Sequence, residues 1–215
     1  GAPLVQPPAR NPSRGHDKEP ALPSSPSSSQ LATSPFTKPS SKRPVCAPVI
    51  AMAELLRSQI KGTTLARAKA EDVPDIKKMV TAAYSKYVER MGKPPAPMVA
   101  DYDQLLQTCD IFVLRTDEAD KHVGSIVLSV ESDSDAVQIN NLVVDPAAQG
   151  RGFGRALIGC AEDLARAKGR TALTLYTNVK MYENFGLYAK MGFEEIDRRT
   201  EAGYQRVYFR KELAQ

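Results

Sequence analysis

The chain has 215 residues, 42% of them hydrophobic, which is enough for one domain with a packed core and a tail. No apolar run approaches the ~20 residues that a membrane span requires, so we expect a soluble protein with no membrane partner. Only three cysteines and two histidines are present, which argues against a disulfide framework, a zinc site or a histidine-based mechanism. We therefore predict no metal, and we expect His122 to open a strand as an ordinary surface residue.

Residues 1–61 differ in composition from the rest of the chain. They contain eleven of the sixteen prolines and ten serines, and such a composition buries too little apolar surface to offset the entropy of ordering the chain. We therefore predict a disordered tail over 1–61 and a single domain over 62–215. The tail carries a net charge of +5 and the domain a net charge of −1, so no basic surface indicates a nucleic acid partner.

The tail also bears on localisation. It contains Arg and Ser but few acids, as organelle transit peptides do, yet no amphipathic Arg-rich helix is evident before Ala51. We expect a cytoplasmic protein, with import into an organelle through the tail as the alternative.

Hydrophobic periodicity and turn residues predict the elements of the domain. In chain order they are a strand over 64–70, a helix over 71–92, a loop over 93–97, a helix over 98–109, strands over 111–117, 122–130 and 136–144, a helix that follows a glycine-rich stretch and stops at Gly169, a strand over 171–177, a helix over 180–192, and strands over 193–199 and 204–213. The order predicts an α+β domain with a mostly antiparallel sheet and one strand–helix–strand crossover.

The glycine-rich stretch, DPAAQGRGFGRALIG, places three glycines at the start of a predicted helix, where each costs ~1 kcal/mol relative to alanine. A Walker phosphate loop is excluded because Arg155 and Ala156 follow the last glycine instead of Lys and Ser or Thr. A Rossmann fingerprint is disfavoured by the glycine spacing and by the absence of an acid about 20 residues later. The remaining alternatives are a helix entry without a ligand and an anion site.

An anion site agrees best with the chemistry of these residues. The N-terminus of a helix offers unpaired N–H groups and a partial positive charge, and glycines let phosphate oxygens approach the backbone. Arg151 and Arg155 add positive charge nearby. The stretch therefore predicts a cradle for a pyrophosphate.

Two segments resemble motifs of the GNAT superfamily of acyl-CoA-dependent N-acetyltransferases. LVVDPAAQGRGFGRALI resembles its motif A, Gln/Arg-x-x-Gly-x-Gly/Ala, and NFGLYAKMGFEE resembles its motif B. The element order is similar from about residue 63 to 214. The resemblance implies a GNAT-like fold, a mixed, mostly antiparallel central sheet flanked by helices with a splayed strand pair, and it implies acetyl-CoA as the co-substrate.

The resemblance also implies residues that contact the cofactor. Pantetheine would bond the backbone of Leu142, Val143 and Val144, and pyrophosphate would bind to Gln149, Gly150, Arg151, Gly152, Phe153, Gly154 and Arg155. Asn184 is a candidate by its position alone, one turn before Tyr188 on the same helix face, from which it could bond the cofactor or orient Tyr188. Many members instead carry an asparagine about seven positions before the tyrosine, where this chain has Met181.

Tyr188 resembles the tyrosine that many members use to protonate the departing thiolate, and the alternative is a core tyrosine. Several members carry a glutamate as general base where this chain has Asn140 and Asn141, and an amide cannot accept a proton. The base then lies elsewhere, or water carries the proton. The weaker candidates for the base are Glu89, Glu131, Asp133 and Asp135.

The sequence therefore predicts an N-acetyltransferase that acts on a primary amine of a small molecule or peptide. The alternative is a non-catalytic acyl-CoA-binding sensor or interaction module of the same fold, and a homodimer is left open. The residues expected to line the acceptor site are Tyr84, Tyr87, Arg90, Met91, Arg198 and Tyr204.

Overall fold

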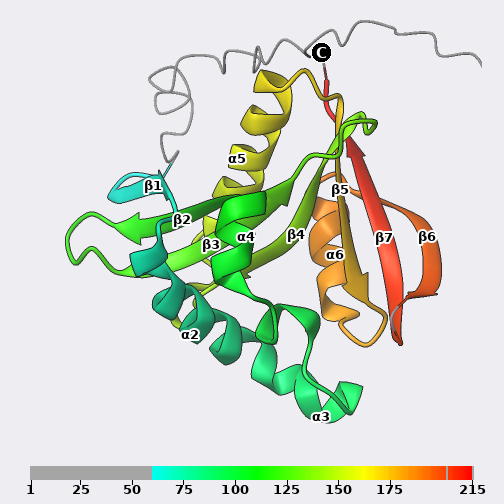
Figure 1. Ribbon diagram of the computed structural model, residues 1–215, viewed down its shortest axis with the longest axis horizontal. Coiled ribbons are helices and arrows are strands. Elements are labelled where there is room, and N and C mark those ends of the chain that lie inside the picture. The colour runs from blue at the N-terminus through cyan, green and yellow to red at the C-terminus, as the bar shows by residue number, and fades with distance from the viewer. Residues whose placement is uncertain (1–59, 202, 215) are drawn as a thin grey trace, which may run out of the picture. The chain divides into compact units, whose positions relative to one another are not determined.

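The computed structural model describes residues 60–201 and 203–214 (Figure 1). The tail predicted over 1–61 therefore lies outside the described residues, except for Ile60 and Lys61. The helices and strands are β1 (Thr63–Arg67), α2 (Val73–Tyr84), α3 (Val88–Met91), α4 (Tyr102–Thr108), β2 (Asp110–Thr116), β3 (His122–Ser129), β4 (Ala136–Val144), α5 (Phe153–Ala167), β5 (Ala172–Asn178), α6 (Glu183–Lys190), β6 (Glu194–Glu201) and β7 (Tyr204–Glu212). Short 3-10 turns cover Ala70–Asp72, Ser85–Tyr87, Ala96–Met98 and Pro146–Ala148.

All seven strands form one sheet in the order β1-β2-β3-β4-β5-β7-β6. Every neighbouring pair is antiparallel except β4 and β5, which are parallel and are joined through the crossover helix α5. The predicted fold class is confirmed. The sequence did not indicate that β7 would insert between β5 and β6, and this insertion places the chain's last strand beside the crossover.

Helices cover both faces of the sheet, so the core has two parts. On one face α5 packs a fully buried row, Leu157, Ala161 and Leu164, against the strands, and α6 adds Phe185. On the other face α2 and α4 enclose a second cluster. Figure 1 shows α4 in front of the sheet and α5 behind it. Within the described ranges, no helix combines the length and apolarity needed to cross a bilayer.

A β-bulge at Asn140 changes the face of the sheet on which the side chains of β4 lie. The register with β3 shifts there, because Val127 pairs with Asn141 while the next residue pairs with Ile139. Before the bulge, Ile139 belongs to the α5 cluster; after it, Val143 belongs to the α2 cluster. Without the extra residue at Asn140, the strict alternation of a strand would place Ile139 and Val143 on the same face of the sheet.

The two helices predicted before the sheet are shorter than expected. The helix predicted over 71–92 is interrupted by a 3-10 turn at Ser85–Tyr87 and ends at Gly92, whose φ of 73° favours glycine. The helix predicted over 98–109 begins only at Tyr102, because the Asp101 carboxylate accepts hydrogen bonds from the N–H groups of Asp103 and Gln104.

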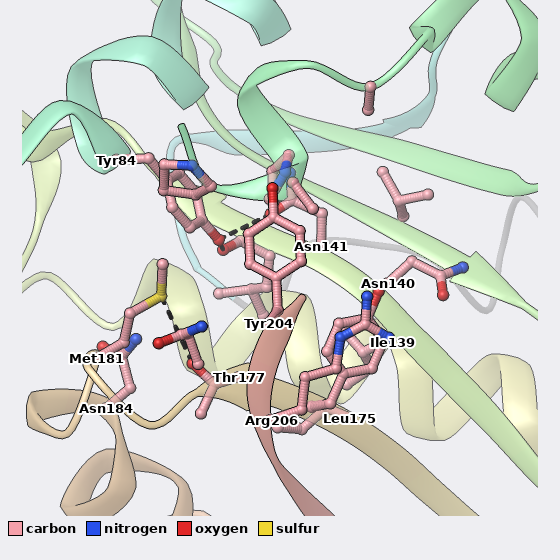
Figure 2. A pocket seen from close by; sticks show the side chains of 18 of the residues that line it. Tyr84, Ile139, Asn140, Asn141, Leu175, Thr177, Met181, Asn184, Tyr204 and Arg206 are labelled. Atoms are coloured by element: carbon pink, nitrogen blue, oxygen red, sulfur yellow. Dashed lines mark hydrogen bonds between the residues drawn. The ribbon is translucent and has the colours of Figure 1, made fainter. Parts of the chain in front are cut away.

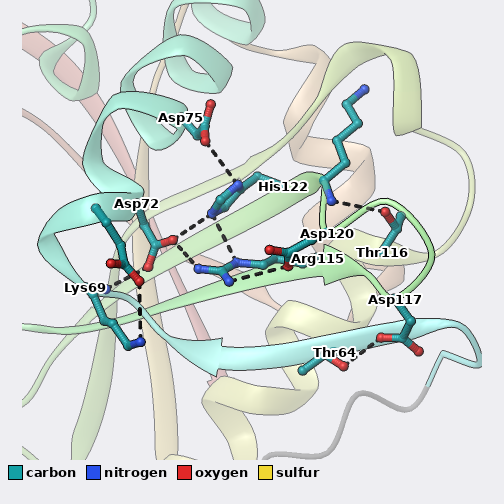
Figure 3. Close-up of polar contacts among 11 residues, drawn as sticks. Thr64, Lys69, Asp72, Asp75, Arg115, Thr116, Asp117, Asp120 and His122 are labelled. Carbon is teal, nitrogen blue, oxygen red and sulfur yellow. Dashed lines mark hydrogen bonds and ion pairs between the residues drawn. The ribbon is translucent and has the colours of Figure 1, made fainter.

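The start of α2 is fastened to the sheet by a polar network around Asp72 (Figure 3). His122 Nε2 lies 2.8 Å from Asp72 Oδ1, which also accepts from Arg115, and the other carboxylate oxygen accepts from the N–H of Lys69. Burial acts to raise the pKa of Asp72, but these three partners together hold it below its ordinary value. His122 opens β3 as predicted, but the expectation of an ordinary surface residue is wrong, since only 13% of its side chain is exposed.

We predict that Gly124→Ala destabilises the fold. A Cβ at Gly124 in β3 would lie 2.9 Å from Leu157 Cδ1 and 3.2 Å from the carbonyl oxygen of Val143. Because Leu157 is fully buried, it has no free space to move into. The free energy of unfolding, measured by urea titration, should fall by about 1–3 kcal/mol.

Gly186→Ala is the matched control. Gly186 lies inside α6, and no neighbouring atom stands within 4 Å of the position that a Cβ would take there, so the better helix propensity of alanine should raise stability by up to about 1 kcal/mol. Equal stability of the two variants would contradict close packing of α5 on β3.

Candidate functional site

Strands β4 and β5 pair over only part of their length. Their parallel register runs from Ala136 opposite Ala172 to Ile139 opposite Leu175 and stops there. Beyond this point β4 continues to pair with β3, and β5 continues to pair with β7. We call the divergence after Ile139 and Leu175 the fork. The predicted splayed strand pair is thereby confirmed.

The fork leaves one edge of β4 without a partner strand. The carbonyl oxygen of Leu142 receives only a 3.4 Å contact from the Tyr84 hydroxyl, and that of Val144 only a 3.4 Å contact from Gln149 Nε2. Backbone groups of alternate residues point to the same side of a strand, so both carbonyls face the open edge. An extended ligand that carries amides could pair with this edge as another strand would.

The fork opens into a cavity of about 360 Å³ that side chains from both faces of the sheet line (Figure 2). Tyr188 and Ile158 reach it from the face of α5 and α6, while Tyr84, Tyr102 and Tyr204 reach it from the opposite face. An uninterrupted sheet would separate these two groups. The cavity is therefore a passage through the sheet, of a size that is usual for a small-molecule site.

The glycine-rich stretch lies directly after the open edge of β4, as the sequence predicted. Gly150 and Gly152 have φ values of 79° and 84°, and α5 begins at Gly152 without a side-chain cap. Among the described residues, no backbone acceptor takes the N–H groups of residues 149–152, and the first turn of α5 adds further unpaired N–H groups. Arg151 and Arg155 are exposed beside this helix end.

A hydrogen-bonded chain occupies the position where a glutamate was expected in β4. The Tyr84 hydroxyl donates to Asn141 Oδ1 at 2.9 Å, Asn141 Nδ2 donates to the Tyr102 hydroxyl at 3.1 Å, and that hydroxyl donates to the carbonyl oxygen of Pro97 at 3.1 Å. Burial raises the pKa of Tyr102 to about 12 and raises that of Tyr84 well above its usual value. Both hydroxyls therefore keep their protons at neutral pH and cannot serve as a base.

Tyr188 lies half-buried on α6 and borders the cavity together with Asn184, one turn earlier. Its ring packs against Phe193 and Phe209, with ring centroids 6.2 and 5.4 Å away. Burial raises the pKa of Tyr188 to about 12, against the opposing effect of the Thr177 hydroxyl. The side chain therefore stays protonated and can donate a proton at neutral pH.

The structure divides the residues expected to line the acceptor site. Tyr84, Met91 and Tyr204 line the cavity, whereas Tyr87, Arg90 and Arg198 do not. Arg90 instead joins α3 to Glu183 at 2.6 Å, and Arg198 pairs with Glu195 at 2.5 Å. Those three expectations are wrong.

None of the acids considered as a base lines the cavity; these are Glu89, Glu131, Asp133 and Asp135. Asp135 pairs with Arg210 at 2.7 Å. Within the part of the chain that the structure describes, no group of three or more His, Cys, Asp or Glu side chains could hold a metal ion.

Sequence reasoning missed Arg206 and the role of Asn141. Arg206 enters the cavity from β7 (Figure 2), and only the insertion of β7 beside β5 brings it there. The signal at Asn141 was available, because two adjacent asparagines interrupt an otherwise apolar strand.

Comparison with known proteins agrees with this architecture. The model of the GNAT acetyltransferase domain family matches residues 107–195. The chain is 33% identical over 92 residues to an IAA acetyltransferase of Azospirillum brasilense, and 36% identical over 61 residues to an uncharacterized N-acetyltransferase of Methanocaldococcus jannaschii. The matches cover 43% and 28% of this chain, and 60% and 27% of those two relatives.

Solved structures share the fold. Ard1 from Thermoplasma volcanium superposes with a TM-score of 0.58 at 16% identity, over 72% of this chain and 99% of that chain. The chain thus resembles the GNAT acetyltransferase domain family in sequence over residues 107–195, and it shares its fold with solved structures of that kind.

Proposed function

We propose that this domain transfers the acetyl group of acetyl-CoA to the primary amine of a small molecule or peptide. The observation that carries the proposal is the fork, because the open strand edge at Leu142 and Tyr188 border one cavity, and β4 continues from that edge into the uncapped N-terminus of α5. We also propose that residues 62–215 form a domain whose activity does not require the tail.

The residues present fit the chemistry of coenzyme A. The open carbonyls of Leu142 and Val144 suit the amides of pantetheine. The backbone of Val143, the residue between them, instead faces β3, so the contact expected at Val143 is not part of this proposal. Pyrophosphate suits the unpaired N–H groups from Gln149 to Arg155, a segment that contains Gly150, Arg151, Gly152, Phe153 and Gly154. Asn184 has no side-chain hydrogen bond to the described residues and borders the cavity, so its amide is available to the thioester end.

The reaction requires the protein to supply a proton to the departing sulfur. The amine nitrogen attacks the thioester carbonyl carbon, the N–C bond forms, and the C–S bond breaks. The departing sulfur takes the proton of the Tyr188 hydroxyl, and the amine proton leaves through water, which returns a proton to Tyr188. Tyr84 and Tyr102 stay protonated and hold Asn141 in place beside the acceptor.

The absence of an ionisable base supports one alternative. Among the described residues that line the cavity there is no carboxylate or imidazole, as expected for a module that binds acyl-CoA without turnover. Release of free thiol from acetyl-CoA in the presence of a panel of amines separates the two functions, because only an acetyltransferase gives amine-dependent release.

We predict that acetyl-CoA raises the melting temperature, since a ligand at 100 times its Kd adds about 2.7 kcal/mol of stability. Arg151→Gln and Arg155→Gln should each weaken this binding by up to about fivefold, as exposed charge pairs typically contribute. Arg166→Gln is the control, because Arg166 lies at the other end of α5 and pairs with Glu162 and Asp163. A melting temperature that rises with ATP but not with acetyl-CoA would contradict the assignment of this site to acetyl-CoA.

We predict that Tyr188→Phe lowers turnover by roughly 10²–10⁴-fold, the usual contribution of general acid catalysis, with little change in acetyl-CoA affinity. Phenylalanine preserves the packing on Phe193 and Phe209. Tyr182→Phe is the matched control, since Tyr182 begins the same helix but is 59% exposed. If Tyr188 were only a core residue, both variants would turn over at the wild-type rate.

We predict that the rise of kcat/KM with pH follows the acceptor. When no side chain accepts the amine proton, the neutral fraction of the amine sets the rate. For two acceptors whose amine pKa values differ by about two units, the ascending limbs of kcat/KM against pH should therefore lie about two pH units apart. A common ascending limb for both acceptors would instead reveal a base in the protein.

A further inference from the structure

The acceptor side of the cavity has an unusual charge composition. Five tyrosines line the cavity, together with prolines, Met91 and Leu105. Of the described residues that line it, none is Asp, Glu, His or Lys, and a single one, Arg206, is charged. A ligand that enters here therefore meets a largely apolar, aromatic surface with neutral amide groups and one cation.

Arg206 is held in a fixed orientation toward the cavity. Its guanidinium carbon lies 4.2 Å from the centre of the Tyr176 ring, and Nη1 donates to Glu201 Oε2 at 2.9 Å. Only 18% of its side chain is exposed. A guanidinium has five N–H donors, so most of them remain for a ligand in the cavity.

Arg206 is one of two arginines that face each other across β6 and β7, and it is the one that borders the cavity. Arg206 on β7 lies directly opposite Arg199 on β6, and like charges in cross-strand pairs are destabilising. Glu201 lies between them and pairs with both, at 2.9 Å in each case. Arg199 is 54% exposed and does not line the cavity, whereas Arg206 borders it. Arg206 is therefore a partly buried cation, held by Glu201, at the border of the cavity, where an anionic group of a ligand could reach it.

The same composition disfavours a polycationic acceptor. Each ammonium group that does not react would lie in an apolar site without a carboxylate to pair with, and would face the positive charge of Arg206. An acceptor with a carboxylate reverses the sign of that interaction, because guanidinium and carboxylate form strong, charge-assisted hydrogen bonds.

Contacts between the segment that follows α3 and the start of β7 limit the size of the acceptor. The Tyr204 hydroxyl donates to the carbonyl oxygen of Pro94 at 3.1 Å, and Lys93 Nζ donates to that of Gly203 at 2.8 Å. These contacts join the segment between α3 and α4 to the start of β7 across the acceptor side, with Pro95 and Pro97 beneath. A cavity of about 360 Å³ suits a small molecule.

We propose that the acceptor is a small amine that also carries a carboxylate and an apolar body, as an apolar α-amino acid does, and that Arg206 binds the carboxylate. This inference rests on the proposed function and narrows its substrate class. Arg206 then acts as the specificity-determining residue, and it takes no part in breaking the thioester.

The test compares amino acids with the amines that lack only the carboxylate. The pairs are phenylalanine with 2-phenylethylamine, leucine with 3-methylbutylamine and tyrosine with tyramine, and spermidine is added as a polycation. Thiol release from acetyl-CoA gives kcat/KM, expressed per concentration of neutral amine, and the melting temperature with CoA reports binding of each probe. We expect at least about a tenfold preference for the amino acid in a pair, since a charge-assisted bidentate contact is lost with the carboxylate.

Arg206→Gln should remove this preference by raising KM for the amino acids, while the amines and the acetyl-CoA-induced rise in melting temperature stay unchanged. Arg199→Gln is the matched control, because it also removes a partner of Glu201 but lies outside the cavity, and it should keep the preference. The inference is overturned if amines or spermidine react as well as the amino acids, if Arg206→Gln keeps the preference, or if no amino acid is acetylated or bound.

The proposed function fails in a different way. In that case acetyl-CoA would leave the melting temperature unchanged and no amine of the panel would release thiol. If acetyl-CoA binds and only amines without a carboxylate are acetylated, the function stands and the assignment of Arg206 is wrong.

Discussion

The early end of the pairing between β4 and β5 is the constraint on which the rest of the site depends. Parallel pairing stops at Ile139 and Leu175, and the bulge at Asn140 turns the following residues of β4 over. These two features leave backbone carbonyls at an open edge and let α6 and α2 contribute side chains to one cavity. A continuous sheet with the same residues would bury Tyr188 and Tyr84 on opposite faces with no path between them.

Local signals were sufficient to predict most elements and the glycine-rich stretch. Gly150 and Gly152 adopt positive φ values, and the short-range pattern around them carries this information in the sequence. The fork itself came from the family resemblance, because no local pattern says where two strands that are far apart in the chain stop pairing. The break at Ser85–Tyr87 depends on how α2 meets the sheet, and helical periodicity continues through it.

Two kinds of information were inaccessible from the sequence. The β-bulge at Asn140 decides that Asn141 faces Tyr84 and Tyr102, and the two adjacent asparagines in the sequence do not show which of them is the extra residue. The strand order decides that Arg206 lines the cavity and that Arg198 does not. His122 shows the same limit, since contacts with Asp72 and Asp75 at the start of α2 and with Arg115 on β2 make an expected surface residue part of a polar network.

The protonation state of the cavity links its chemistry to its selectivity. Burial keeps Tyr84, Tyr102 and Tyr188 protonated, so the cavity offers proton donors and one permanent cation but no anion among the described residues that line it. Such a surface stabilises negative charge wherever it develops or is brought in. In the proposed reaction the departing thiolate and the acceptor carboxylate are both anions, and they would be bound near Tyr188 and near Arg206 respectively. The lack of a base therefore follows from the same composition that favours an acidic acceptor, because a carboxylate in the lining would compete for Arg206.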